Sequence, residues 1–281
     1  MGINVLSLFD GMSCGQIALN RAGIKYDNYF ASEIDKHAIR VTQANYPNTK
    51  QLGSITELDG AKLPKIDLLF GGSPCQSFSS AGKGLGFDGE SKLFWEYIRV
   101  LKETNPTYFL LENVVMKKEW ENIITEALGV KPITINSKVV CGANRPRLYW
   151  TNIPNITDIK DAGIKLIDVL ENLNFDKAPY VENYISNRPV NYKIEKFNTL
   201  RAGAGSRTRG IGICNDDGWW RKLTPIECER LQTVPDNYTN QVSDTQRYKM
   251  LGNGWTVDVI AHIFKGLLKV GLKPGVKHFQ A

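Results

Sequence analysis

The amino-acid sequence predicts an α/β protein whose parallel strands alternate with helices and end along one rim of a sheet. Asn4 to Phe9 is a short apolar run that passes through a glycine-containing turn into an amphipathic helix. Two later runs, Ile66 to Phe70 and Thr107 to Val114, are mostly apolar, as expected of strands covered on both faces. Ligands of such sheets bind at the carboxyl ends of the strands, so the residues that follow these runs are the first candidates for a functional site.

The first strand and helix predict a cofactor pocket. The turn contains Gly11, Ser13 can cap the helix that follows, and Gly23 can end it. A second strand, Tyr29 to Ser32, ends at Glu33, about 20 residues beyond the turn, where doubly wound nucleotide-binding folds place an acid for the ribose hydroxyls. The turn lacks the GxGxxG pattern that holds a pyrophosphate, which favours a nucleoside cofactor over NAD.

The third strand predicts a displayed nucleophile. Cys75 follows two glycines and Pro74 at the end of this strand, and it precedes the glycine-rich stretch Ser79 to Gly89, a candidate flap. Alternatively, Cys75 is a packing residue, since unpaired cysteines are among the most buried residue types. Glu112 and Asn113 end the next strand at the same rim, so a carboxyl group and a thiol would share one site. The alternative for Glu112 is that it caps the following turn.

Further helices and strands continue the alternation. Caps and apolar stripes predict helices after Asp35 and after Ser91, and a third helix that ends at Gly129. Strands are expected over Pro132 to Ser137 and over Leu148 to Thr151. The chain up to this point therefore reads as one α/β unit.

A small inserted lobe is predicted next. Between Pro154 and Trp220 the periodicity dissolves into Asn, Asp and Gly residues, including the glycine-rich stretch Thr199 to Gly210. A capping box at Thr224 then opens a new helix, and a last amphipathic helix ends at Gly271. The regular architecture therefore resumes after the lobe.

Composition narrows the class of protein. The chain has 281 residues, 42% of them hydrophobic and 23% charged, which predicts one large core with a smaller lobe. The net charge of +6 permits a polyanionic partner. Five cysteines without CxxC or Cys/His clusters predict neither a disulfide framework nor a metal site and favour a reducing cytoplasm. No apolar run approaches the roughly 18 residues of a membrane span, so we expect neither a signal peptide nor a membrane anchor.

Seven short motifs, in order along the chain, resemble those of the DNA (cytosine-5)-methyltransferase family. The match is to the bacterial and phage type, with spacing similar to the short eukaryotic de novo type. It covers Asn4 to Pro154 and Arg221 to Phe264 and leaves the middle uncovered. The motifs are Phe9-Asp10-Gly11 with Gly15, Glu33, Pro74-Cys75-Gln76, Glu112-Asn113-Val114, Arg145-Pro146-Arg147, Arg221 to Gln232 with Pro235-Asp236, and Gly252-Asn253-Gly254-Trp255.

The resemblance implies an S-adenosylmethionine-dependent methyltransferase (Rossmann-like) fold with a small inserted target-recognition domain. Residues 1–154 and 221–281 would form the catalytic domain, and residues 155–220 the target-recognition domain. The cofactor would be S-adenosylmethionine, leaving as S-adenosylhomocysteine. Ser54 stands where the family often has an acid reaching the adenine, and Asp67 is the alternative for that contact. The implied cofactor-binding residues are Phe9, Asp10, Gly11, Gly15, Glu33, Ser54, Asp67, Pro74, Asn253 and Trp255.

The family's chemistry accounts for the residue types in the motifs. Cytosine C5 is a poor nucleophile until a thiolate adds at C6, and Cys75 would add there. Addition places negative charge on the ring, and Glu112 beside N3 would share or supply the compensating proton. Arg147 would bond the base carbonyl oxygen, while Asn113 and Arg145 would support the site from behind. The resemblance thus implies these five residues as the catalytic group.

The implied partner is double-stranded DNA, bound by a monomer. A base inside a duplex must flip out to be reached, and Gln76 and Ser79 are expected to contact the DNA there. Arg201, Arg207 and Arg209 in the glycine-rich stretch would read guanines or, alternatively, bind phosphates. The expected setting is the cytoplasm of a bacterial or phage-infected cell, with a restriction-modification role.

Two other functions stay open at this stage. The first is the same reaction on RNA, because one eukaryotic branch of the family has the same motifs and methylates tRNA. A catalytically silent nucleic-acid-binding relative is the second, although it would be expected to lose Cys75 or Glu112.

Overall fold

The computed structural model describes residues 2–74, 93–175, 189–202 and 212–269, and it confirms the predicted α/β architecture. The main sheet has the strand order β3-β2-β1-β4-β5-β7-β6. Neighbours among β1 to β5 pair in parallel, whereas β7 pairs antiparallel with both β5 and β6. The strand bounds are β1 Ile3–Leu8, β2 Tyr26–Ser32, β3 Lys50–Gln51, β4 Leu68–Gly72, β5 Tyr108–Val114, β6 Ile133–Asn136 and β7 Pro146–Thr151.

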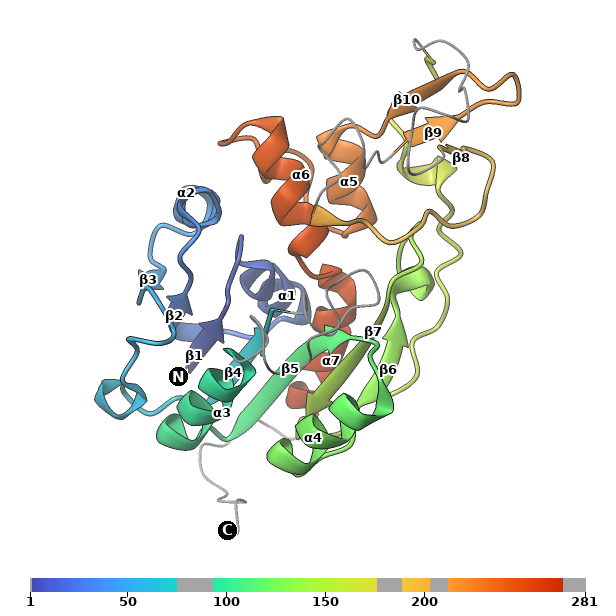
Figure 1. Ribbon diagram of the computed structural model, residues 1–281. Coiled ribbons are helices and arrows are strands. Elements are labelled where there is room, and N and C mark those ends of the chain that lie inside the picture. Colours follow the sequence, from blue (N-terminus) through green and yellow to red (C-terminus); the bar gives the residue numbers. More distant parts are fainter. Residues whose placement is uncertain (1, 75–92, 176–188, 203–211, 270–281) are drawn as a thin grey trace.

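Helices cover both faces of this sheet (Figure 1). Helices α1 and α7 contribute to one hydrophobic core, and α3 and α4 contribute to a second core on the opposite face. The central strands β1, β4 and β5 are buried almost throughout, which explains why they read as continuous apolar runs. The helix bounds are α1 Cys14–Ala22, α2 Lys36–Asn45, α3 Leu93–Thr104, α4 Lys118–Leu128, α5 Pro225–Leu231, α6 Asp244–Asn253 and α7 Val257–Leu268, with 3-10 turns at Gly60–Lys62, Ser137–Val139 and Ile167–Val169.

Both ends of the described chain build the same layer. Helix α7 packs beside α1, and Arg21 on α1 forms an ion pair with Asp258 on α7 at 2.7 Å. A Cβ atom at Gly266 would lie 2.3 Å from the carbonyl oxygen of Pro154, so α7 approaches the segment after β7 only because residue 266 has no side chain. Segments from the two ends of the sequence therefore pack together on one face of the sheet.

A second, three-stranded sheet stands apart from the first (Figure 1). Its strands are β8 Val190–Asn191, β9 Gly212–Cys214 and β10 Trp220–Lys222. A buried ion pair between Arg221 on β10 and Glu227 on α5, at 2.7 Å, joins it to the helices below. No strand was expected here, because strands of two or three residues are too short to show periodicity. Helix α6 was missed as well, since it is mostly polar and carries no apolar stripe.

Most predicted helix ends are confirmed, with one correction. Asp35 and Thr224 cap α2 and α5 with their side chains, and Gly23 and Gly129 end α1 and α4 in the left-handed conformation. Ser13 stands at the N-cap of α1 but makes no capping hydrogen bond, because its hydroxyl donates to a nearby carboxylate instead. The helix expected after Ser91 is present as α3, although Ser91 and Gly271 lie outside the described residues.

Candidate active site

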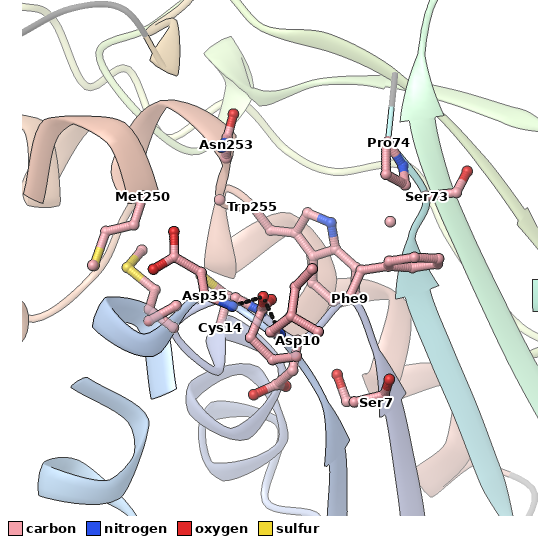
Figure 2. A pocket seen from close by; sticks show the side chains of 18 of the residues that line it. Ser7, Phe9, Asp10, Cys14, Asp35, Ser73, Pro74, Met250, Asn253 and Trp255 are labelled. Atoms are coloured by element: carbon pink, nitrogen blue, oxygen red, sulfur yellow. Dashed lines mark hydrogen bonds between the residues drawn. The ribbon is translucent and has the colours of Figure 1, made fainter. Parts of the chain in front are cut away.

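A cavity of about 650 Å³ opens where β1, β2, β4 and β5 end. Its walls come from the turn after β1, from the residue after β2, from the end of β4 and from the loop after α6. Figure 2 shows the side chains of Phe9, Asp10 and Trp255 gathered between Met250 on one side and Pro74 on the other. The strand-end rule used for the sequence thus locates the cavity.

Glu33 links the backbone on one side of the cavity. One carboxylate oxygen accepts the Gly11 N–H at 2.7 Å, and the other accepts the N–H groups of Ile34 and Asp35 at 2.7 and 2.8 Å. A carboxylate offers about four acceptor sites, so capacity remains for a ligand hydroxyl. Glu33 therefore ties the turn after β1 to the start of α2 and also faces the cavity.

Ile34 is a cavity residue that the sequence analysis missed. Its side chain is 76% exposed and borders the cavity directly after Glu33. A large apolar side chain held in water at a polar rim suits the face of a flat aromatic ligand. A single isoleucine after an acid leaves no pattern in the sequence, so only its exposure reveals it.

Asp10 is a buried acid beneath the cavity. Tyr29 donates its hydroxyl to one carboxylate oxygen at 2.7 Å, and Ser13 donates to the other. Burial raises the pKa of Asp10 to about 6, and these hydroxyl donors oppose the rise. Phe9, Gly11 and Ser13 all have positive φ, so the turn around Asp10 is strained at two positions that carry side chains.

Glu112 and Arg147 form the polar centre of the other side. Glu112 Oε1 lies 2.9 Å from Arg147 Nε, and the two side chains are only 12% and 13% exposed. Trp255 donates its indole N–H to Glu112 Oε2 at 3.1 Å. The carboxylate therefore has a donor on each oxygen, one from β7 and one from the loop after α6.

Arg145 and Asn113 brace backbone around this centre. The Arg145 guanidinium donates to the carbonyl oxygens of Leu200, Gly252 and Gly254 at 2.9, 3.2 and 2.9 Å. Asn113 is buried and donates to the Ser73 hydroxyl at 3.1 Å. Both residues thus fix loops that border the cavity, and Arg145 also lines it.

The other predicted cofactor residues divide into two groups. Ser54 and Asn253 line the cavity, as do Phe9, Gly11, Pro74 and Trp255. Gly15 lies inside α1, where a Cβ atom would come within 2.4 Å of the Phe70 ring. Asp67 lies at the amino end of β4, where it accepts the Asn4 N–H at 2.9 Å, so the structure does not bring it to the cavity.

Several predicted residues lie outside the described part of the chain. Arg201 is described and exposed, and its backbone touches the last turn of α6, since a Cβ atom at Gly252 would lie 2.2 Å from its carbonyl carbon. The predicted nucleophile and four of the predicted DNA-binding residues are outside, namely Cys75, Gln76, Ser79, Arg207 and Arg209.

Two further cavity residues carry reactive or charged groups. Lys249 on α6 pairs with Asp35 across the cavity at 2.7 Å. Cys14 also lines the cavity, but burial raises the pKa of its thiol to about 12, so it stays protonated and unreactive at neutral pH. In the ranges that the structure describes, no three His, Cys, Asp or Glu residues are placed to hold a metal ion, and no helix has the length and apolar character to cross a membrane.

Comparison with known proteins gives a consistent result. The family model described as C-5 cytosine-specific DNA methylase matches residues 3–127 and 144–269. The Type II methyltransferase M1.ScrFI of Lactococcus lactis subsp. cremoris is 32% identical over 305 residues, covering 95% of this chain and 78% of the relative. The Type II methyltransferase M.HhaI of Haemophilus parahaemolyticus is 28% identical over 311 residues, covering 93% of each chain. The solved structure of the Entamoeba histolytica methyltransferase EhMeth shares the fold, with a TM-score of 0.76 and 17% identity over 97% of this chain and 100% of that one.

The raised pKa of Asp10 predicts an unusual dependence of stability on pH. Its ordinary value is 3.8, so between about pH 4 and pH 6 the native state keeps a proton that the unfolded state has lost. The stability due to the protonated acid is present below about pH 4 and is lost as the pH rises through about 6. Asp10→Asn cannot ionise, so its free energy of unfolding relative to wild type should increase by about 1.4 kcal/mol between about pH 5 and pH 7.5.

Denaturant unfolding across this pH range measures the difference. Asp236→Asn serves as the control, because hydrogen bonding to Arg230 lowers the pKa of Asp236. The stability due to that pair is lost only as the pH falls below about 4, so between about pH 5 and pH 7.5 the difference between the control and wild type should stay constant. A difference between Asp10→Asn and wild type that is the same at every pH would contradict the burial of an ionisable Asp10.

Proposed function

The chain belongs to the C-5 cytosine-specific DNA methylase family, and from this premise we propose which of its residues carry out the methyl transfer. It is a DNA cytosine-5 methyltransferase, and the family takes its methyl group from S-adenosylmethionine. The observation that carries the assignment of roles is the contact between Glu112 and Arg147 in the same cavity as Glu33 and Pro74. Cys75 directly follows Pro74 in the sequence and lies outside the described residues.

The cavity fits an S-adenosylmethionine molecule. Its volume of about 650 Å³ lies in the range of ligand pockets. Glu33 has acceptor capacity for ribose hydroxyls, and the exposed side chain of Ile34 suits the face of an adenine ring. Ser54 lines the cavity and can contribute a hydroxyl to the adenine edge. When bound, the cofactor supplies an electrophilic methyl group on a positively charged sulfur.

We assign the nucleophile and the acid as follows. The Cys75 thiolate adds to C6 of a flipped-out cytosine, and the pair of electrons displaced from the C5–C6 double bond is delocalised toward N3 and the carbonyl oxygen. Glu112 meets this charge at N3 by sharing or supplying a proton. C5 then accepts the methyl group from the cofactor, which leaves as S-adenosylhomocysteine. Loss of the C5 proton to a base expels the Cys75 thiolate, and the proton at N3 returns to Glu112, so the neutral ring is restored. A covalent cysteine intermediate is typical of the family.

In this assignment Arg147 holds Glu112 and also binds the flipped cytosine. It pairs with Glu112 through Nε and donates from Nη1 to the Pro146 carbonyl oxygen at 2.8 Å. These contacts use two of the five N–H groups of a guanidinium. The remaining N–H groups can reach the base carbonyl oxygen, while Arg145 and Asn113 act behind the site by bracing the loops that border it.

DNA is the partner, and we propose that the small lobe reads it. In this division residues 1–154 and 221–281 form the catalytic domain and residues 155–220 the target-recognition domain, acting as a monomer in the cytoplasm. Arg201 is exposed where the lobe meets the end of α6, which supports a contact with the duplex there. Arg207 and Arg209 complete the proposed reading group, with Gln76 and Ser79 at the flipped base. Phosphate binding is the alternative for these arginines.

The proposed nucleophile can be trapped covalently. DNA containing 5-fluorocytosine should form a denaturant-resistant adduct with the wild-type protein and S-adenosylmethionine, because fluorine at C5 cannot leave as a proton does. Cys75→Ser should form none, since a serine hydroxyl is not ionised at neutral pH. Gel electrophoresis detects the adduct, and peptide mass spectrometry locates it.

The control for trapping is Cys141→Ser. This buried thiol donates to backbone carbonyls that a serine hydroxyl can also reach, so the adduct should persist. An adduct that survives Cys75→Ser would remove Cys75 as the nucleophile. An adduct with 5-fluorocytosine RNA but none with DNA would contradict DNA as the substrate.

Glu33 should contribute to cofactor affinity. Glu33→Ala removes an ionised acceptor for the ribose hydroxyls, so titration calorimetry with S-adenosylhomocysteine should show binding weakened by about 1.5 to 3 kcal/mol. Glu33→Gln keeps one carbonyl acceptor and should lose less. Thermal unfolding of both variants separates this effect from loosening of the turn at Gly11. Unchanged affinity in Glu33→Ala would exclude Glu33 from the cofactor site.

A further inference from the structure

The orientation of the Glu112 carboxylate depends on two segments that are far apart in the sequence. Arg147 holds Oε1 from β7, and the Trp255 indole N–H holds Oε2 from the loop after α6. A carboxylate with a donor on each oxygen cannot rotate about its terminal bond without breaking one contact. The loss of either donor would leave the acid less well aimed at a base.

The Trp255 indole is itself fixed from several directions. The carbonyl oxygen of the preceding Gly254 accepts from Arg145 at 2.9 Å and from Gln232 at 3.2 Å. The indole also packs against the Phe70 ring in a tilted arrangement, with 5.8 Å between ring centroids and 58° between the ring planes. Backbone and ring contacts together set the direction of the N–H bond, so the indole is a preorganised donor.

Gly72 leaves the space that this hydrogen bond occupies. Gly72 and Glu112 are paired in the register of β4 and β5, so their side chains would point to the same face. A Cβ atom at Gly72 would lie 3.0 Å from both Trp255 Nε1 and Glu112 Oε2. A methyl group there would crowd both partners, which gives a physical reason for glycine at this position.

We propose that Trp255 is a positioning residue for Glu112, in addition to forming part of the cofactor wall. The inference rests on the proposed role of Glu112 as the acid. The segment that contributes Trp255 also contributes Asn253 and Gly254 to the cofactor cavity, so this segment aims the acid from within the cofactor pocket. The indole N–H acts through the carboxylate and does not touch the reacting atoms.

The kinetic test separates positioning from cofactor binding. Trp255→Phe keeps an aromatic face and removes the N–H, so kcat should fall about ten-fold or more, while the Kd of S-adenosylmethionine and the KM of DNA change by less than about three-fold. Gly72→Ala, which keeps the indole and crowds the contact, should lower kcat in the same way. Trp120→Phe, on α4, is the matched control and should keep the wild-type kcat.

A spectroscopic test reads the contact without substrate. In the NMR spectrum of ¹⁵N-labelled protein, the indole N–H resonance that disappears in Trp255→Phe is assigned to Trp255. The chemical shift of this resonance should change in Glu112→Gln, because its acceptor is altered. The Trp150 indole donates to Thr125 Oγ1 and should not move. The NMR measurement tests the contact even if the protein has another function. A methylation assay of the wild-type protein tests the proposed function separately. The proposal would be overturned if the chemical shift of the Trp255 indole were unchanged in Glu112→Gln. It would also be overturned if Trp255→Phe had a normal kcat and weakened cofactor binding.

Discussion

The partly buried ion pair between Glu112 and Arg147 is the interaction on which the arrangement of the site depends. Glu112 pairs with Tyr149 in the antiparallel register of β5 and β7, so Arg147 is its diagonal neighbour on the adjacent strand. The reversed direction of β7 in an otherwise parallel region brings this arginine to the end of β5. Removing either partner would leave a charge in a site with little water, which is costly. The same contact therefore contributes to local stability and, in the proposed mechanism, sets the geometry of the acid.

Backbone carbonyl groups connect this centre to the rest of the molecule. Arg145 is two residues before Arg147, and it donates to the carbonyl oxygen of Leu200 and to those of Gly252 and Gly254, at the end of α6 and directly after it. The close approach of Arg201 to Gly252 joins the same two segments by packing. The cavity wall and the segment around Leu200 are thus joined by the same set of contacts.

Sequence reasoning located the residues that strand ends dictate, and its errors have physical causes. Glu33 and Glu112 follow from the rule that parallel strands present their carboxyl ends to one cavity. Asp67 precedes a strand and so stays at the opposite edge of the sheet. Ser13 matched a capping pattern, but a carboxylate three residues away competes for its hydroxyl. The contact of Trp255 with Glu112 spans 143 residues, and no local pattern can show it.

Single-turnover methyl transfer by Glu112→Gln tests the central claim most directly. With labelled S-adenosylmethionine and duplex DNA, the variant should react slower than wild type by a factor of about 100 to 10,000, with cofactor and DNA affinity nearly unchanged. Glutamine keeps the shape and an acceptor but cannot supply the proton. Glu119→Gln, an exposed carboxylate on α4, should react at the wild-type rate. A Glu112→Gln rate within a few-fold of wild type would show that Glu112 is not the acid and that the site is organised around another group.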